Sequence, residues 1–175
     1  RMPMASVGNA PASATARGEL WAVTVTPSDG HGNGPTGSAS ITIANSPPSI
    51  STGAITPNPA AVGDTLTCGY TFVDADGDSD SSTVAWTVNG SPVGTGSTLS
   101  GSFGNGDLVT CTVTPSDGTD TGTPVPFSMT VGNTTPTVTS LVIGPSSPQT
   151  NDTVQATAGT FDADGDPVTL SYAWY

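Results

Sequence analysis

The sequence contains no lysine, and its two arginines face fourteen acidic residues, which gives a formal net charge of −12. Nucleic acid is therefore excluded as an expected partner, because phosphate binding needs clustered lysine or arginine side chains to release counterions. No run of about 18 apolar residues is present, so no membrane-spanning helix is predicted. Charged residues make up only 9% of the chain and apolar residues 34%, which favours a folded domain over acidic disorder.

Glutamate, glutamine, lysine and arginine, the polar residues that favour helices, are nearly absent. In their place stand 22 glycines, 16 prolines and many serines and threonines, a composition typical of short strands joined by turns. Alternation of apolar and polar residues predicts an all-β fold with seven strands in the middle of the chain. The expected strands are Ser49–Ile55, Thr65–Val73, Val84–Val88, Ser91–Val93, Ser97–Ser100, Leu108–Thr114 and Pro126–Val131.

The sequence begins at Arg1 and its first residues lack the apolar stretch of a signal peptide. We therefore expect a processed or excised piece of a longer chain. Three Asn-X-Ser/Thr triplets, at Asn89, Asn133 and Asn151, are candidate glycosylation sites. Together with the lysine-free, threonine- and serine-rich composition, they favour an extracellular or cell-surface location.

A repeat organises the chain. The acidic stretch Asp74–Asp78 recurs unchanged as Asp162–Asp166, an offset of 162 − 74 = 88 residues, and Trp86 recurs as Trp174 at the same offset. Other matches at this offset join Thr26–Gly30 to Thr114–Gly118, Gly18–Leu20 to Gly106–Leu108, and Asn45–Pro48 to Asn133–Pro136. A constant period without insertions indicates tandem modules.

Prolines in the stretches that follow Asn45 and Asn133 mark the module boundaries. The first segment, residues 1–45, then corresponds to the C-terminal half of a module. The central segment, 46–133, is a complete module, and the last segment, 134–175, corresponds to an N-terminal half. Each half leaves apolar strand residues without a facing sheet. Covalent neighbours in a long array, or separate copies docked head to tail, are the two ways of covering them.

Cys68 falls in the second expected strand, Trp86 in the third and Cys111 in the sixth. This order resembles the immunoglobulin arrangement, which implies a disulfide between Cys68 and Cys111 packed on the tryptophan. Two buried free thiols are the alternative. The flanking segments carry Val23 and Ala156 at the equivalent positions, so the fold is not expected to depend on the bridge.

The Asp-Ala-Asp-Gly-Asp loop before a tryptophan-containing strand, the Thr-Pro-Ser-Asp-Gly strand end and the Asn-X-X-Pro linker resemble tandem immunoglobulin-like, cadherin-like and PKD-type repeats. Such repeats occur in large bacterial and archaeal extracellular proteins. The resemblance extends over essentially the whole chain. It implies immunoglobulin-like antiparallel β-sandwich modules that serve as stalks, fibres or adhesins, many of which bind calcium.

Three carboxylates at alternate positions repel one another unless a cation lies among them. An EF-hand is excluded, because a loop beginning at Asp74 places Ala85 where the twelfth-position glutamate belongs. In the sandwich expected here, the loop after the second strand and the loop after the sixth lie at the same end. The candidate ligands of a Ca²⁺ site at each boundary are Asp74, Asp76, Asp78, Asp117 and Asp120, with Asp162, Asp164, Asp166 and Asp29 in the incomplete segments.

A solvated acidic turn is the alternative to calcium. Zinc is disfavoured, because the single histidine, His31, has no neighbouring cysteine or histidine in the sequence and is expected to be a loop residue.

These features predict a non-catalytic structural repeat of an extracellular filament, stalk or surface fibre, joined head to tail to copies of itself or to covalent neighbours. The alternative is an adhesin or carbohydrate-binding module, which would need exposed aromatic residues on one face, whereas aromatics make up only 6% of the chain. An enzyme is not expected, since no separate acid and base, Ser/His/Asp set or glycine-rich phosphate loop is evident.

Overall fold

The computed structural model describes residues 8–10 and 14–175. Within these ranges the regular structure consists of eleven β-strands, and none of the described elements is an α-helix. The contacts divide the chain into two compact units. The first contains the described residues up to Ser49 together with the loops 72–82 and 115–123, and the second contains residues 50–71, 83–114 and 124–175. Arg1–Met4, where no signal peptide was expected, lie outside the described residues.

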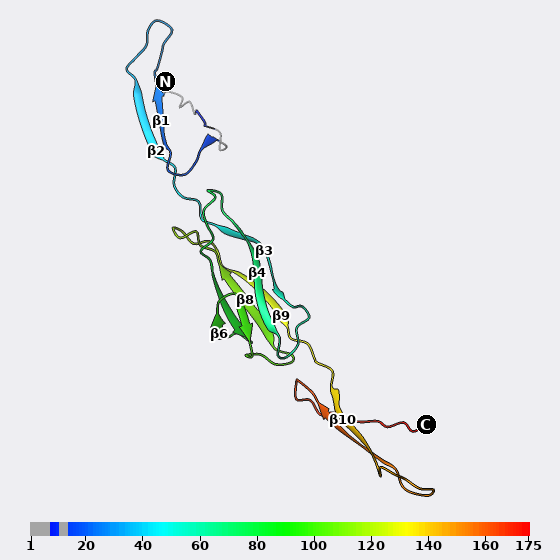
Figure 1. The fold of residues 1–175 in the computed structure, drawn as a ribbon. Coiled ribbons are helices and arrows are strands. Elements are labelled where there is room, and N and C mark those ends of the chain that lie inside the picture. Colours follow the sequence, from blue (N-terminus) through cyan, green and yellow to red (C-terminus); the bar gives the residue numbers. More distant parts are fainter. Residues whose placement is uncertain (1–7, 11–13) are drawn as a thin grey trace. The chain divides into compact units, whose positions relative to one another are not determined.

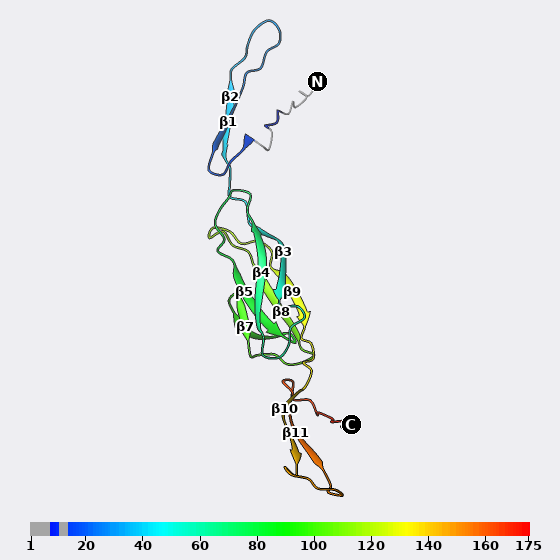
Figure 2. The ribbon, with the colours of Figure 1, turned by 45° about the vertical axis from the view of Figure 1, so that its right-hand side comes forward.

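The regular part of the first unit is an antiparallel hairpin of β1 (Leu20–Val25) and β2 (Gly37–Thr42). It is visible as the blue and cyan ladder in Figures 1 and 2. Leu20 pairs with Thr42 at one end of this ladder and Val25 with Gly37 at the other. The connecting loop is closed by the Gly34 amide, which donates a hydrogen bond of 2.8 Å to the Pro27 carbonyl.

Two antiparallel sheets form the central segment. One has the order β3-β4-β7 and the other the order β6-β5-β8-β9. The strands of the first are β3 (Ser49–Thr56), β4 (Thr65–Val73) and β7 (Thr98–Ser100). Those of the second are β5 (Thr83–Val88), β6 (Ser91–Thr95), β8 (Leu108–Thr114) and β9 (Val125–Thr130). Their positions confirm the expected strands, which differ from the observed bounds by at most two residues at an end.

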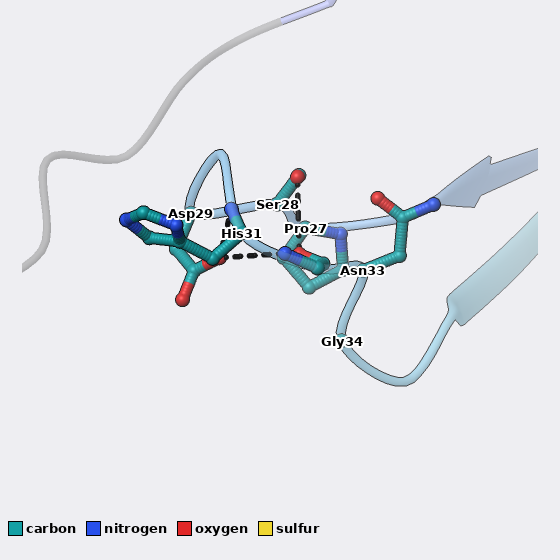
Figure 3. Close-up of a pocket in the computed structure, with 7 residues that line it drawn as sticks. Pro27, Ser28, Asp29, His31, Asn33 and Gly34 are labelled. Atoms are coloured by element: carbon teal, nitrogen blue, oxygen red, sulfur yellow. Dashed lines mark hydrogen bonds between the residues drawn. The ribbon is translucent and has the colours of Figure 1, made fainter.

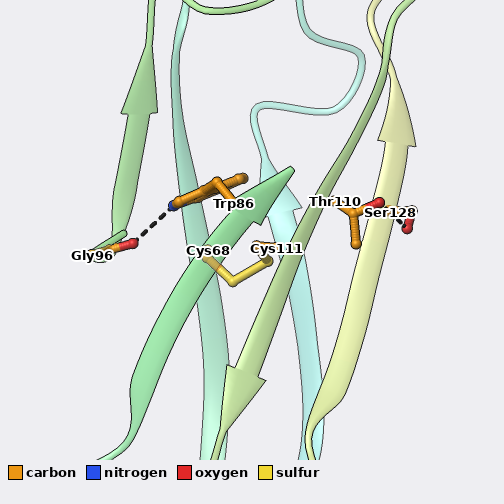
Figure 4. The surroundings of a disulfide bond; sticks show 6 residues. All are labelled: Cys68, Trp86, Gly96, Thr110, Cys111 and Ser128. Carbon is orange, nitrogen blue, oxygen red and sulfur yellow. Dashed lines mark hydrogen bonds between the residues drawn. A yellow bond between two sulfur atoms is a disulfide. The ribbon is translucent and has the colours of Figure 1, made fainter. Parts of the chain in front are cut away.

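Alternating side chains from both sheets form one apolar core. Leu66 and Cys68 of β4 point inward, as do Val109, Cys111 and Val113 of β8, and all five are buried. Alternation places every second residue on the inner face, so threonines and serines occupy the outer one. The outer pair Thr110 and Ser128, for example, is joined by a 2.8 Å hydrogen bond (Figure 4).

A disulfide joins Cys68 of β4 to Cys111 of β8 and so links the two sheets (Figure 4). This confirms the expected pairing and excludes the alternative of two free thiols. The neighbouring Trp86 of β5 is fully buried, and its indole N–H donates a 2.8 Å hydrogen bond to the Gly96 carbonyl. The buried ring therefore keeps its one polar atom satisfied.

The last segment folds as a second hairpin, in which β10 (Thr137–Gly144) pairs with β11 (Gln155–Phe161). Unlike the strands of the central segment, this hairpin has no facing sheet among the described residues, and its large apolar side chains are exposed. Those side chains are Val138, Leu141, Val142, Ile143 and Phe161. No helix in the part of the chain that the structure describes could cross a membrane.

Candidate metal centres

The stretch 74–78 folds into a tight loop directly after β4. Oδ1 of Asp74 accepts hydrogen bonds from the backbone amides of Asp76 (2.8 Å) and Asp78 (3.0 Å), which curls the chain around this carboxylate. Gly77 adopts φ +79°, a left-handed conformation that glycine reaches without strain. As a result, one oxygen from each of the three aspartates lies within 4.8 Å of the others. The loop thus gathers three acidic oxygens that could hold a cation.

The linker after β2 closes over this loop. The backbone amide of Ser46 donates a 2.7 Å hydrogen bond to Oδ2 of Asp76. The guanidinium of Arg17 forms an ion pair with Asp78 and donates a second hydrogen bond of 2.6 Å to the side-chain oxygen of Asn45. Oδ2 of Asp74 is buried and has no hydrogen-bond partner among the described residues. It is the one carboxylate oxygen of the loop that is left buried without a donor.

Asp117 and Asp120 lie next to the linker residue Asn45, and their role as further metal ligands stays a prediction. The carboxylates grouped closely enough to hold a cation at this loop are those of Asp74, Asp76 and Asp78. The side-chain amide of Asn45 donates to Oδ2 of both Asp117 and Asp120, over 2.7 Å and 2.9 Å. This contact with Asn45, followed by the Asp120 backbone amide, holds the pKa of Asp117 below its usual value. The Asn45 side chain therefore connects this acidic pair to the Arg17 guanidinium.

The second copy of the acidic loop has the same internal geometry. Oδ1 of Asp162 accepts from the amides of Asp164 (3.0 Å) and Asp166 (3.1 Å), and Gly165 again has φ +79°. The backbone amide of Thr134 donates to Oδ2 of Asp164, as Ser46 does to Asp76. Three oxygens of this triad also lie within 4.8 Å of one another.

Two side-chain oxygens at the second loop are buried without a partner in the described chain, namely Oδ1 of Asp164 and Oγ1 of Thr134. Buried oxygen atoms that lack a donor are costly, and a bound cation or water is the usual remedy. The same condition thus recurs at both copies of the motif.

Asp29 is placed in the β1–β2 loop, where its Oδ1 accepts from the amides of His31 (2.9 Å) and Gly32 (3.0 Å) (Figure 3). These bonds lower the pKa of Asp29 below its usual value. Ser28 lies beside it, but the hydroxyl of Ser28 donates to the Gly32 carbonyl (3.1 Å). The hollow lined by this loop therefore contains serine, aspartate and histidine side chains, but the hydrogen bonds of the Ser28 and Asp29 side chains run to backbone atoms.

The three candidate glycosylation residues differ in what their side-chain amides bind. Asn89 donates to Oδ1 of Asp107 over 2.7 Å and adopts φ 49° at the turn between β5 and β6. Asn133 donates to the Thr134 carbonyl over 3.0 Å. Asn151 is exposed, and its side-chain amide makes no hydrogen bond within the described part of the chain. A glycan would be attached to a nitrogen that already donates a hydrogen bond at Asn89 and Asn133, and to a nitrogen without one at Asn151.

Sequence reasoning placed the linker at Asn45 near the acidic loops but missed what binds there. Arg17 and the backbone amides of Ser46 and Thr134 were not expected as partners of the triads. A signal for Arg17 exists, because it is one of only two arginines in a chain with fourteen acidic residues. Backbone donors leave no mark in the sequence.

Comparison with family models, with curated proteins and with solved structures found no match for this chain.

Proposed function

We propose that the chain is a non-catalytic structural repeat unit of an extracellular filament, stalk or surface fibre, built from immunoglobulin-like modules joined head to tail. The sheet orders β3-β4-β7 and β6-β5-β8-β9 support the module type, since they correspond to the A-B-E and C′-C-F-G sheets of such a sandwich. The disulfide then joins strands B and F, beside the tryptophan of strand C.

The flanking hairpins match parts of the complete module strand for strand. β1 and β2 correspond to β8 and β9 at the 88-residue offset, and the register is the same: Leu20 pairs with Thr42 as Leu108 pairs with Thr130. In the same way β10 and β11 correspond to β3 and β4. The hairpins are therefore the F–G and A–B portions of modules of the same kind.

The main support for the proposal is the difference in exposure between residues that occupy equivalent positions in the flanking hairpins and the central module. Val25 is 60% exposed, whereas its equivalent Val113 is 0% exposed, and Ile41 is 68% exposed, whereas its equivalent Met129 is 6% exposed. Residues of such size are unfavourable in water when they are gathered on one sheet face. We infer that the missing strands of each module cover these faces in the functional assembly, which makes the chain one unit of a linear array.

The exposed aromatics follow the same rule. Trp174 is 57% exposed, while its equivalent Trp86 is fully buried, and Tyr172 is 51% exposed, while its equivalent Val84 is buried. These aromatics therefore belong to incomplete cores. A glycan-binding face, which the adhesin alternative would need, is not required to explain them.

A tandem fusion tests the array. Positions 175 and 1 correspond to positions 87 and 89 of the central segment, so one added residue between two fused copies restores the 88-residue period. We expect the junction to fold into a third module, with protected backbone amides in β1, β2, β10 and β11 by hydrogen exchange. Ile41→Asp in the second copy should abolish this protection, and the matched Thr42→Asp, on the outer face, should leave it. Exchange in the fusion equal to that of two separate chains would refute the proposal.

We further propose that the acidic triads bind Ca²⁺ and stiffen the linkers between modules. The fit rests on the three hard oxygen ligands of each loop and on the buried, unpartnered oxygens of Asp74 and Asp164. When bound, the ion would supply the positive charge that three clustered carboxylates need. The carboxylates of Asp74, Asp76 and Asp78 would hold it in the first loop, and those of Asp162, Asp164 and Asp166 in the second.

Asparagine substitutions test the metal sites. In Asp74→Asn and Asp162→Asn, Oδ1 can still accept the two loop amides, so the loop fold should survive while the charge is lost. We expect weaker Ca²⁺ binding by calorimetry and a smaller rise in melting temperature on adding Ca²⁺. Asp64→Asn is the control, because Asp64 caps the Ala61 amide (2.8 Å) and belongs to neither triad. No difference between chelator and Ca²⁺ for the unmodified chain would refute the metal role.

The disulfide indicates an oxidising compartment. Among oxidising compartments, an extracellular or cell-surface location fits a fibre. It also agrees with the acidic, lysine-free composition.

A further inference from the structure

The apolar face of the β1–β2 hairpin is hollowed at Ala39. The hollow is lined by residues of both strands, among them Trp21, Val23, Ala39 and Ile41, by Ile43 after β2, and by Ala10 and Thr15 before β1. The position equivalent to Ala39 in the complete module is 39 + 88 = 127, where Phe127 packs against the core. A small residue thus stands in the first segment where the central segment has a large aromatic one.

The partner of Phe127 shows the reverse change. Phe127 lies over Gly53 of β3 so closely that a Cβ atom at Gly53 would be 2.6 Å from its ring carbon Cε2. Real Cβ atoms do not approach so near, so a glycine is needed under this ring. The equivalent of Gly53 in the last segment is 53 + 88 = 141, which is Leu141, 62% exposed. The central module thus has a glycine in β3 under a phenylalanine in β9. At the equivalent positions the flanking segments have a leucine in β10 and an alanine in β2.

The two cysteine positions of the disulfide also differ together between the central segment and the flanking segments. The equivalents of Cys68 and Cys111 are 68 + 88 = 156 and 111 − 88 = 23, which are Ala156 in β11 and Val23 in β1. Both cysteines are replaced by apolar residues, one in each flanking segment, so neither segment presents an unpaired thiol to the other. Strands from an unrelated module would have no reason to match at both pairs.

A polar pair fits the same match. In the complete module the Asn45 side chain donates to Asp117 over 2.7 Å. The equivalents are Asn133, which precedes the last segment, and Asp29 in the first. Asp29 uses Oδ1 to cap its own loop, as Asp117 does. The other oxygen of Asp29, Oδ2, therefore corresponds to the Asp117 oxygen that accepts a hydrogen bond from the Asn45 amide.

We propose that the β10–β11 face of one copy of this chain completes the module begun by the β1–β2 face of a second copy, with Leu141 of one copy filling the hollow at Ala39 of the other. The proposal deepens the structural role proposed above, since it commits the covering strands to another copy of this chain. Such a contact joins different faces of identical chains, so it is heterologous and propagates as a linear filament.

A size-swap experiment on the full chain tests this pairing. Sedimentation velocity of the unmodified chain should show concentration-dependent association. Ala39→Phe fills the hollow, and Leu141→Gly removes the side chain that would occupy it. Each should weaken association about tenfold or more, because overpacking and cavities are both costly at a packed contact. The double variant Ala39→Phe with Leu141→Gly recreates the pair seen in the central module and should restore association.

Mixing gives a further version of the test. A chain that carries only Ala39→Phe should associate alternately with a chain that carries only Leu141→Gly, although each associates poorly with itself. Both contacts between unlike chains are well packed, since one joins the two substituted positions and the other joins the unmodified Leu141 and Ala39. Ser38→Phe is the matched control, since position 38 is on the outer face of β2 and corresponds to the exposed Pro126. It should associate like the unmodified chain.

Two results would overturn the inference. An unmodified chain that stays monomeric at all concentrations would mean that covalent neighbours cover the two faces. Association that the double variant does not restore would mean that the faces meet in another register. The tandem fusion described above separates these results from a failure of the structural role itself, because a fused junction folds whether or not free chains associate.

Discussion

The backbone amide of Ser46 donates a hydrogen bond to Oδ2 of Asp76, thirty residues further along the chain, over 2.7 Å. The same bond joins Thr134 to Asp164 one repeat later. Ser46 is followed by Pro47 and Pro48, which have no N–H. Its amide is therefore the last donor of the linker before β3, and the middle aspartate of the loop accepts it. This bond fixes the linker against the acidic loop at the same point in both repeats.

Removing that acceptor should loosen the linker. In Asp76→Ala the Ser46 amide loses a charged acceptor, and we expect a loss of about 1–3 kcal/mol in local stability. Hydrogen exchange of the Ser46 amide, followed by NMR, measures it directly. Asp76→Asn keeps an acceptor oxygen and should have a smaller effect, and the Thr134 amide should not respond to either change. Unchanged exchange at Ser46 in Asp76→Ala would show that the bond does not restrain the linker.

The two linkers differ in one charge. Position 17 + 88 = 105 carries Asn105, whose side chain donates to Asn133 over 3.1 Å, just as Arg17 donates to Asn45. The backbone presents both residues alike, since Gly18 and Gly106 donate to Ile43 and Val131 over 2.9 and 3.0 Å. Only Arg17 also pairs with an aspartate of its triad. The first triad therefore has a tethered cation that the second lacks.

If the triads bind Ca²⁺, this difference predicts unequal affinities. The pair of Arg17 and Asp78 is 40% and 21% exposed, and such solvent-screened pairs are worth only about 1 kcal/mol or less, or about fivefold in affinity. We expect Arg17→Asn to tighten Ca²⁺ binding at the first loop by this factor, and Asn105→Arg to weaken it at the second. The Gly77 and Gly165 amide signals in an NMR titration report each loop separately. Arg17→Lys, which keeps the charge, is the control, and two loops that titrate alike in the unmodified chain would contradict the prediction.

The strands could be predicted from the sequence because alternation and turn residues are local signals. Thr65–Val73 and Leu108–Thr114 were predicted to the residue, and in both the more buried positions alternate with less buried ones. The acidic triads could also be predicted, because each is contiguous and closes through its own backbone. The expected place of Asp117 and Asp120 beside the linker followed from the loop order of the sandwich. Their hydrogen bonds to the Asn45 side chain had no local signal in the sequence, because these contacts join residues more than seventy positions apart.

Acid should weaken the contact between Asp107 and Asn89. Oδ2 of Asp107 accepts from the Gly104 amide and Oδ1 from the Asn89 side chain, both over 2.7 Å. The Gly104 bond, followed by the Asn89 bond, lowers the pKa of Asp107 below its usual value. A group with a lowered folded pKa stabilises the fold fully above its unfolded pKa, about 3.9 for aspartate, and this contribution is lost as the pH falls through the lower folded value.

Asn89→Ala should therefore raise the pKa of Asp107 toward its ordinary value, while the Gly104 bond keeps part of the shift. An NMR titration of the side-chain carboxyl carbon measures the change. Asp29, whose pKa is lowered by amides of its own loop, is an internal control and should titrate as before. An Asp107 pKa that does not move in Asn89→Ala would show that Gly104 alone sets it.

The flanking segments show how the disulfide can be removed without leaving a polar atom in the core. The equivalents of Cys68 and Cys111 are Ala156 and Val23, so Cys68→Ala with Cys111→Val copies a pair that this repeat already uses. The bridge closes a loop with a sequence separation of 43 residues, and its loss should lower the free energy of unfolding by about 2–4 kcal/mol, mainly because the unfolded chain gains freedom. The folded core should persist, since Leu66, Trp86 and Val109 remain packed around the site.

Urea unfolding followed by tryptophan fluorescence measures this change, because Trp86, unlike Trp174, is fully buried in the folded core. Cys68→Ser with Cys111→Ser is the comparison variant. It loses the same bridge but buries two hydroxyl groups, and should therefore be less stable than the alanine–valine variant by about 1–3 kcal/mol. Reduction of the unmodified chain should give a stability that is higher than that of either variant and lower than that of the oxidised chain. If the alanine–valine variant fails to fold, the bridge is required for the central module, and the bridge-free pair in the flanking segments then depends on contacts that the central module lacks.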